Sequence, residues 1–327
     1  MDLQARRDLI KDGFRDRFGG EPTVWARAPG RVDLMGSHTD YNLGYVLTQA
    51  IDRDTWIAAR PRGDGQVTIE SLNLGGRGEF PLEEIEYDEA VPWTNYVRGV
   101  ASVLQEEGYP LCGFDGLIHS TIPFGSGLSS SAALEVTTAV LFDTLGGLDI
   151  DPVQMALLCQ RAENEFVGMN SGILDQYSSI IGEAGSVLLL DSRDMTSRTK
   201  PVAEGIQVII FHTRASRELT GSEYAERRAQ CEEGAGILGG FYPEVQSLRD
   251  ASLEQLSAHR ADLSDVVYRR CRFVIEENQR VLDIAAALAR GDQGQIATLA
   301  AQSYAGSAVN RFGISFGAKV LAAASAL

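Results

Sequence analysis

The spacing of apolar and polar residues divides the chain into a strand-rich first part and a helix-rich second part. Alternating or continuous apolar runs predict strands over residues 24–28, 32–35, 45–51, 55–60, 67–71, 114–122, 186–190 and 206–211. Apolar positions three or four residues apart predict helices over residues 3–18, 93–107, 152–166, 218–237, 253–258, 264–289 and 293–305. Because the predicted elements change from mainly strands to mainly helices near residue 205, we predict two domains, 1–205 and 206–327.

One stretch combines a strand, a glycine loop and the start of a helix. The apolar segment 114–122 is followed by Gly125 and Gly127, and Ser129–Ser131 then open a run with helical spacing. Glycines let the backbone approach a phosphate, and the unpaired N–H groups of a first helical turn point toward it. The stretch is neither a Walker A loop nor a dinucleotide-binding fingerprint. Taken alone, it fits an anion site and an ordinary serine-capped helix equally well.

Composition and charge narrow the class of protein and its partners. Acidic residues outnumber basic ones 45 to 29, which gives a net charge of −16 and argues against nucleic acid or an anionic membrane as a partner. A local cradle of N–H groups can still bind a phosphate on an acidic protein. The four scattered cysteines predict buried thiols rather than a disulfide framework or a zinc site. With no membrane-span-length apolar segment and no signal peptide, we expect a cytoplasmic protein.

Four motifs, in one order along the chain, point to a known family. A-P-G-R-V-D-L-M-G-S-H-T-D-Y-N-L-G-Y-V-L-T-Q-A-I, residues 28–51, closely resembles the sugar-binding signature of galactokinases. P-F-G-S-G-L-S-S-S-A-A-L-E-V resembles the phosphate loop of the wider GHMP kinase family. R-A-E-N-E-F-V-G-M-N-S-G-I-L-D-Q-Y resembles the segment that carries the catalytic aspartate, and residues 216–232 resemble a second-domain sugar contact. By these motifs the chain is identified as a member of the galactokinase branch of the GHMP kinases.

The resemblance implies a fold, a reaction and a set of ligands. The family's fold is α+β, with two domains and an active site in the cleft between them. Its galactokinase branch transfers the γ-phosphate of ATP to the anomeric hydroxyl of galactose, with ATP and Mg²⁺ as cofactors. Phosphoryl transfer needs mainly positioning and charge stabilisation from the protein, and a glycine–serine loop with nearby carboxylates can supply both. We expect a monomer or a weakly associating dimer.

The same motifs assign roles to individual residues. Asp175 follows a glycine turn and is the expected base, with Arg31 as its partner. The sequence fits either removal of the proton by Asp175 or orientation of the hydroxyl by Asp175. The alternatives without a catalytic role are a helix cap for Asp175 and a structural salt bridge for Arg31. The resemblance further implies sugar contacts from Ser37, His38, Asp40, Tyr41, Gly172 and Tyr224.

The nucleotide and metal contacts come from the phosphate loop and one further carboxylate. The residues expected to bind ATP are Pro123, Gly125, Ser126, Gly127, Leu128, Ser129, Ser130 and Ser131. The resemblance points to Ser131 and Glu163 as the oxygen ligands of Mg²⁺, a hard cation that prefers oxygen. The alternative for Glu163 is a solvated helix residue beside Arg161.

Two features depart from the family pattern. Galactokinases usually carry glutamate at the position of Ser37, where it accepts a hydrogen bond from the sugar's 6-hydroxyl. Serine is shorter, uncharged and able to donate, so L-arabinose and galacturonate are alternative substrates. The family's third glycine motif is expected after residues 302–315 and is absent up to Leu327, so we expect an incomplete second domain. A sugar- and nucleotide-binding regulator with weak or no turnover is therefore the alternative function.

Overall fold

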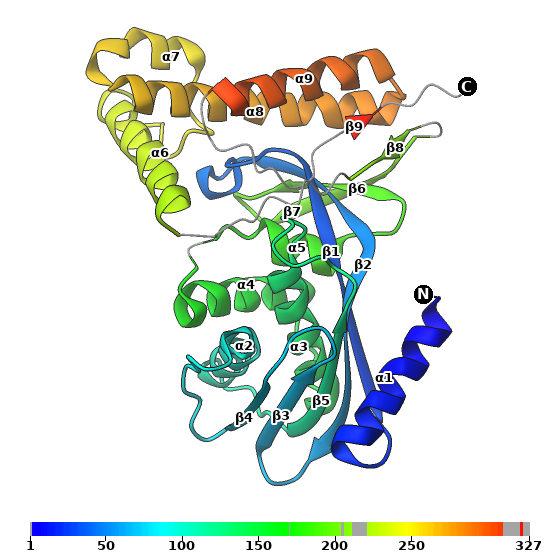
Figure 1. Ribbon diagram of the computed structural model, residues 1–327. Coiled ribbons are helices and arrows are strands. Elements are labelled where there is room, and N and C mark those ends of the chain that lie inside the picture. The colour runs from blue at the N-terminus through cyan, green and yellow to red at the C-terminus, as the bar shows by residue number, and fades with distance from the viewer. Residues whose placement is uncertain (1, 170, 204–205, 211–220, 310–320, 323–327) are drawn as a thin grey trace.

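Two long antiparallel strands form the frame of the molecule. The computed structural model describes residues 2–169, 171–203, 206–210, 221–309 and 321–322. Strands β1 (Val24–Met35) and β2 (Tyr45–Arg62) pair along most of their length (Figure 1). The prediction of two short strands in each stretch was wrong. The Pro29-Gly30 step only shifts the register, because pairing resumes at once between Arg31 and Ala50.

The remaining strands extend this hairpin into a sheet of order β4-β3-β5-β2-β6-β7, with β1 on β2. Strand β5 pairs with the second half of β2, from Thr55 to Arg62, and β6 pairs with its beginning, from Tyr45 to Thr48. One strand is therefore shared by both ends of the sheet. The other bounds are β3 (Gln66–Ser71), β4 (Arg77–Pro81), β5 (Gly113–Ser120), β6 (Ser186–Asp191) and β7 (Thr196–Pro201).

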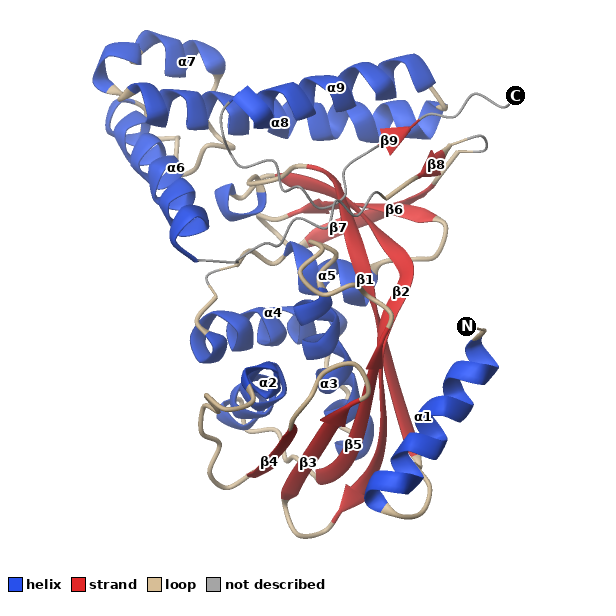
Figure 2. Cartoon of the chain, viewed as in Figure 1, coloured by secondary structure: helices blue, strands red, loops and turns tan. Residues whose placement is uncertain are grey.

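Helices cover both faces of the lower sheet (Figure 2). One face carries α2 (Asn95–Glu106), α3 (Ser130–Gly146), α4 (Pro152–Arg161) and α5 (Leu174–Ile181), with the π-helical turn η3 (Ala162–Val167) between the last two. Their apolar side chains form one core with the sheet, in which Phe114 and Phe142 meet edge to face at 5.4 Å. The other face carries α1 (Leu3–Phe18), whose buried Ile10 and Phe14 pack on Ala58 and Leu117.

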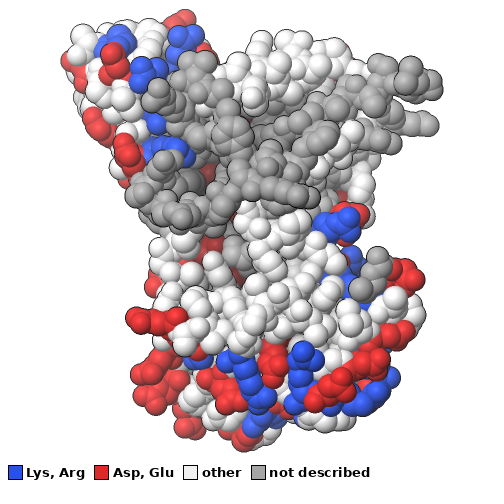
Figure 3. All heavy atoms as spheres, viewed as in Figure 1, with Lys and Arg blue, Asp and Glu red and all other residues white. Residues whose placement is uncertain are grey.

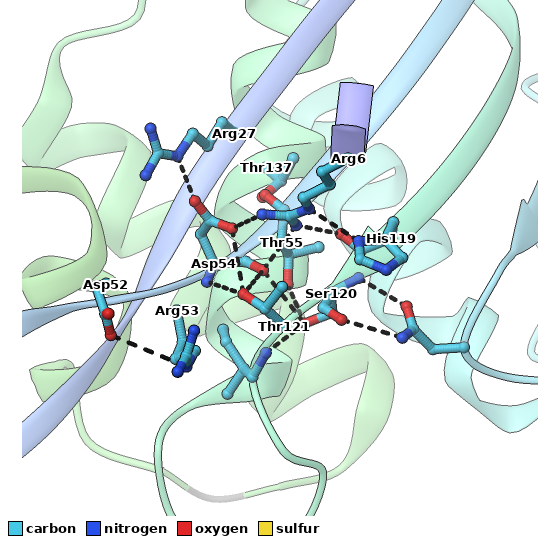
Figure 4. A network of polar contacts seen from close by, with 12 residues as sticks. Arg6, Arg27, Asp52, Arg53, Asp54, Thr55, His119, Ser120, Thr121 and Thr137 are labelled. Carbon is cyan, nitrogen blue, oxygen red and sulfur yellow. Dashed lines mark hydrogen bonds and ion pairs between the residues drawn. The ribbon is translucent and has the colours of Figure 1, made fainter. Parts of the chain in front are cut away.

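A buried polar network also fixes α1 to the sheet (Figure 4). Arg6 is 4% exposed, forms an ion pair with the buried Asp54 and donates from Nε to His119 Nδ1 at 2.8 Å. The Asp54 carbonyl accepts from the N–H of Thr121, just before the glycine loop, at 2.9 Å, and the Asp54 N–H donates to Thr121 Oγ1 at 3.0 Å. The network therefore ties the N-terminal helix to the point where β5 ends.

A helical layer covers the upper end of the sheet, as the helix-rich composition of the second part predicts. It contains α6 (Gly221–Phe241), α7 (Leu253–Ala258), α8 (Asp265–Arg290) and α9 (Gln293–Val309), with the short strands β8 (Gln207–Val208) and β9 (Leu321–Ala322) beside them. Val281 and Ile284 of α8 pack in one cluster with Val32 and Leu47 of the long hairpin. The short 3-10 turns are η1 (Asp40–Asn42), η2 (Pro92–Thr94) and η4 (Arg260–Asp262). The domain boundary near residue 205 stays a prediction.

The surface and the cysteines can be compared with the composition. In the view of Figure 3, acidic and basic side chains are interspersed over the lower half. The four cysteines are free thiols, and three of them are buried. The prediction of four buried thiols was wrong for Cys112, which is only half-buried because it lies just before the first residue of β5. In the described ranges, no helix combines the length and apolarity needed to cross a membrane.

Candidate active site

The pair expected to be catalytic is assembled from β1 and α5. Arg31 is 9% exposed, and Asp175 lies in the first turn of α5, whose cap is Ile173. The cap alternative for Asp175 is therefore wrong. Arg31 Nε donates to Asp175 Oδ1 at 2.9 Å, and Nη2 contacts the same oxygen. The second carboxylate oxygen makes no hydrogen bond within the described part of the chain, on a side chain 28% exposed, which leaves it free to contact a hydroxyl group.

The loop between β5 and α3 has the conformation of an anion site. Gly125 and Gly127 have φ angles of 66° and 76°, in the left-handed region that favours glycine. The cap residue of α3, Ser129, is also left-handed, and its side chain makes no capping hydrogen bond. Its Oγ is buried without a hydrogen-bond partner among the residues described. An ordinary serine cap is therefore wrong, and the first amide groups of α3 remain available to a ligand.

The β1 strand and this loop are in direct contact. A Cβ at position 30 would lie 2.6 Å from the Leu128 carbonyl oxygen, so glycine is required for the close approach. The Arg31 N–H donates to the Leu128 carbonyl at 3.3 Å, and Arg31 Nη1 donates to the Gly127 carbonyl at 2.9 Å. Arg31 therefore joins the loop to Asp175. The eight residues expected to bind ATP all lie in this loop or at the start of α3, and their contacts with ATP stay predictions.

Glu163 lies beside the loop and is not a solvated residue. It is 6% exposed, in the π-helical turn η3, and its Oε2 accepts from Ser171 Oγ and from Gln176 Nε2 at 2.9 Å. Burial raises the pKa of Glu163, the charge of Asp175 raises it further, and hydrogen bonds from Ser171, Gln176 and Ser131 act in the opposite direction. Glu163 is close to Arg161 in the sequence but does not pair with it. Arg161 forms ion pairs with acidic residues at the C-terminal end of α2 and with Glu165.

The donor set of Ser131 and Glu163 fits a magnesium ion. Mg²⁺ bound to nucleotide phosphates needs one or two protein oxygen ligands, and a hydroxyl at the start of α3 together with a buried carboxylate provides them. Across the described ranges, no group of three or more histidine, cysteine, aspartate or glutamate side chains is arranged to hold a metal ion.

The polar loop between β1 and β2 holds the expected sugar contacts in a fixed conformation. His38 has a φ of 72°, and its ring nitrogen Nδ1 lies 2.9 Å from the Tyr41 hydroxyl. The Asn42 side-chain amide donates to the His38 carbonyl at 2.8 Å. Thr39 is fully buried, with its Oγ1 2.6 Å from the carbonyl oxygens of Gly36 and Tyr45. Such order is what recognition of sugar hydroxyls requires.

Asp40 and Gly172 bring this loop against the base-carrying segment. A Cβ at position 172 would lie 1.7 Å from Asp40 Oδ2, so only glycine allows the approach. Burial raises the pKa of Asp40 to about 6, and the charges of Asp175 and Asp33 contribute to the shift. The Asp40 and Asp175 carboxylates are therefore neighbours.

Asp33 is a carboxylate that sequence reasoning missed. Ser37 Oγ donates to Asp33 Oδ2 at 2.6 Å. Arg31 and Asp33 are alternate residues of β1, so their side chains share a face of the strand, opposite to Val32 in the upper core. That alternation was the signal in the sequence that could have identified Asp33.

Helix α8 supplies two further residues that were missed. Glu277 is fully buried and its Oε1 accepts from the Gly36 N–H at 3.2 Å and from Ser303 Oγ at 2.6 Å. The Asn278 side-chain oxygen accepts from the Tyr45 N–H at 2.7 Å. The helical layer thus fixes both ends of the sugar loop. No sequence signal marks this pairing, because it joins positions more than 230 residues apart.

The expected contact of Tyr224 cannot be placed. Its backbone belongs to α6, but its side chain lies outside the described residues, as do residues 216–220 of the same motif. Gly172 lies beside Asp40, and its contact with the sugar stays a prediction.

Comparisons with known proteins agree with this geometry. The description "GHMP kinases N terminal domain" matches residues 95–183, and "Galactokinase galactose-binding signature" matches residues 12–61. The chain is 43% identical to a galactokinase of Roseiflexus sp. (strain RS-1) over 296 residues, 90% of this chain and 75% of that protein. It is also 43% identical to a galactokinase of Chloroflexus aggregans, over 90% of this chain and 76% of the relative.

A solved structure shares the fold over nearly the whole chain. The crystal structure of Lactococcus lactis galactokinase complexed with galactose superposes with a TM-score of 0.90 at 33% identity, covering 95% of this chain and 82% of that one. A heptose 1-phosphate kinase from Bacteroides thetaiotaomicron, at 16% identity and a TM-score of 0.56, shares the fold alone. From the matched motifs, the relatives and this superposition, the chain belongs to the galactokinase family of the GHMP kinases.

Proposed function

We propose that the protein is an ATP-dependent sugar kinase that phosphorylates the anomeric hydroxyl of galactose. The observation that carries the proposal is the contact chain from Asp175 through Arg31 to the Gly127 carbonyl, which supports Asp175 as a base that acts beside bound phosphates. Family membership and the superposition on a galactose complex support the same reaction.

The residues divide the work of the transfer between them. Asp175 Oδ2 accepts the proton of the attacking hydroxyl, or orients that hydroxyl, while Arg31 holds Oδ1. The amide groups at the start of α3 and the buried Ser129 hydroxyl receive phosphate oxygens. Mg²⁺, held by Ser131 and Glu163, would neutralise charge on the phosphates.

The surroundings of Ser37 favour a neutral sugar with a 6-hydroxyl. Because the Ser37 proton is donated to Asp33, the Ser37 oxygen faces other groups as an acceptor, the role that the family's glutamate plays. A galacturonate carboxylate would meet Asp33 and Asp40 and be repelled. These contacts support galactose over galacturonate, and over L-arabinose, which lacks the hydroxyl.

An ADP-release assay over galactose, L-arabinose and galacturonate tests the proposal. We expect kcat/KM for galactose to exceed the other two values by at least about tenfold, the scale of one hydrogen-bonded hydroxyl. The Asp175→Ala variant should lose turnover by orders of magnitude and keep its nucleotide affinity. Tight binding of galactose and ATP without ADP release would instead support a regulatory, non-catalytic protein.

A further inference from the structure

One fully buried side chain joins three helical segments behind the active site. Gln176 of α5 is 0% exposed, and its Nε2 donates to Glu135 Oε2 of α3 at 2.8 Å and to Glu163 Oε2 of η3 at 2.9 Å. Glu135 is likewise 0% exposed. A single amide group thus bridges two buried carboxyl groups, and the expected catalytic roles explain neither Gln176 nor Glu135.

Stability does not explain this arrangement. Burying polar groups costs free energy unless their hydrogen bonds are complete. Here Glu135 Oε1 and Gln176 Oε1 have no hydrogen-bond partner within the described ranges. Apolar side chains of similar volume would be less costly to bury, as replacements of buried charged groups by apolar ones illustrate. The cluster therefore needs a reason other than the free energy of folding.

The position of the amide supplies that reason. Gln176 directly follows Asp175, so the turn of α5 that carries the expected base also carries the bridge. Its acceptor Glu163 is the expected metal ligand, and the same Glu163 oxygen also accepts from Ser171 Oγ. Glu163 also lies in a π-helical turn, where the regular helix repeat does not fix the direction of a side chain.

We propose that Gln176 is a positioning residue that fixes the Glu163 carboxylate relative to Asp175, with Glu135 as the anchor on α3. The inference rests on the proposed kinase function, because it assigns Glu163 to the metal. For this role Glu135 needs only an acceptor oxygen, and Gln176 needs two N–H groups that reach both carboxyl groups.

Isothermal titration of ADP with Mg²⁺ and with EDTA gives a readout that does not depend on turnover. In Gln176→Leu, the gain in ADP affinity from Mg²⁺ should fall by about 10- to 100-fold, the scale for residues that orient metal ligands. The affinity for ADP in EDTA and for galactose should stay within about twofold, because the contacts of the two loops are intact. The kcat should fall along with the metal effect.

Two matched variants separate positioning from packing. Glu135→Gln keeps an acceptor oxygen and should retain most of the Mg²⁺ effect, whereas Glu135→Leu should lose it. Thr138→Val removes a buried hydroxyl of α3 whose hydrogen bond, among the described residues, goes to the Leu134 carbonyl of its own helix, and it should leave every readout unchanged. If Gln176→Leu does not fold, Gln176→Asn, whose shorter side chain cannot span both carboxyl groups, replaces it.

An unchanged Mg²⁺ effect in folded Gln176→Leu or Gln176→Asn would overturn the proposal. So would equal losses in Glu135→Gln and Glu135→Leu, which would mean that more than an acceptor is required. If the wild-type protein phosphorylates no sugar but shows the Mg²⁺ effect, the kinase proposal fails while Gln176 is still tested by the titration.

Discussion

A methyl group at position 172 should disrupt the sugar site while leaving the nucleotide site intact. In Gly172→Ala the added Cβ would lie 1.7 Å from Asp40 Oδ2. Ordinary contact begins at about 3.4 Å, so the loop carrying residue 172 and the Asp40 carboxylate must separate by roughly 1.7 Å. Both flank Asp175, so this displacement directly alters the position of the sugar relative to the base.

The magnitude follows from the sensitivity of transfer reactions to position. A misplacement of about 1 Å can cost about 100-fold in rate, so kcat/KM for galactose should fall by at least that factor, or about 2.7 kcal/mol in activation free energy. Most of the loss should be in KM for the sugar if Asp40 moves, and in kcat if the segment before α5 moves. The KM for ATP should stay within about twofold, because the three atoms nearest to the added Cβ all belong to Asp40, outside the phosphate loop.

Steady-state kinetics with galactose and ATP varied separately, together with thermal melting, check this expectation. Gly63→Ala is the matched control, because a Cβ there meets nothing within 4 Å and its backbone is not left-handed. Wild-type kinetic constants for Gly172→Ala would refute the argument, since they would mean that Asp40 can leave its place without consequence for the sugar. A large fall in the melting temperature of Gly172→Ala would show that the variant loses activity through misfolding instead.

Further predictions concern charge and anchoring. Because the pKa of Asp40 is raised to about 6, its carboxylate is lost as pH falls through that value, and kcat/KM for galactose should fall with it; a flat profile from pH 8 to 5 would contradict this. Because the pKa of Asp40 is raised in the folded protein, the native state binds this proton more tightly than the unfolded state does. The group therefore stabilises the protein below pH 6, and this stabilisation is lost as pH rises. Asp40→Asn should raise the melting temperature at pH 8 while it weakens sugar binding. Arg31→Lys, which keeps the charge but loses the planar fork to Asp175 and Gly127, should lower kcat by roughly tenfold or more, and equal rates would show that charge alone suffices. Removing Arg6 from its buried pair with Asp54 should lower the free energy of unfolding by about 3 kcal/mol in urea titrations, and a change under about 0.5 kcal/mol would mean that solvent compensates.

The local features of the site were accessible from the sequence. Glycines, serines and the Asp175 turn have spacings that fix backbone conformation over a few residues, so the glycine loop before α3 and the start of α5 were predicted, while their roles as phosphate loop and base stay predictions. The helices of the second part were also predicted, since their apolar periodicity is long and regular. The departure at Ser37 was visible as well, but its meaning depended on Asp33, whose contact appears only when the loop closes back on β1.

Features that depend on distant pairing were not accessible. The continuity of β1 through Pro29-Gly30 is decided by hydrogen bonds from β2, which no local pattern records. The burial of Glu163 results from three segments that meet around Gln176, and a charged residue near an arginine in sequence gives no sign of it. The hydrogen bond from the Gly36 N–H to Glu277 likewise joins distant segments and has no signal in the sequence.

The contacts of α8 with the β1–β2 hairpin make the two parts of the chain interdependent in expression. A fragment of residues 1–205 would carry Arg31, Asp175 and the whole phosphate loop, yet it would lack the α8 acceptors for the N–H groups of Gly36 and Tyr45. It would also leave the apolar side of the hairpin, which α8 covers, open to water, and such a surface promotes aggregation. Neither part is therefore a module that can be produced alone or transferred to another protein with its sugar site intact.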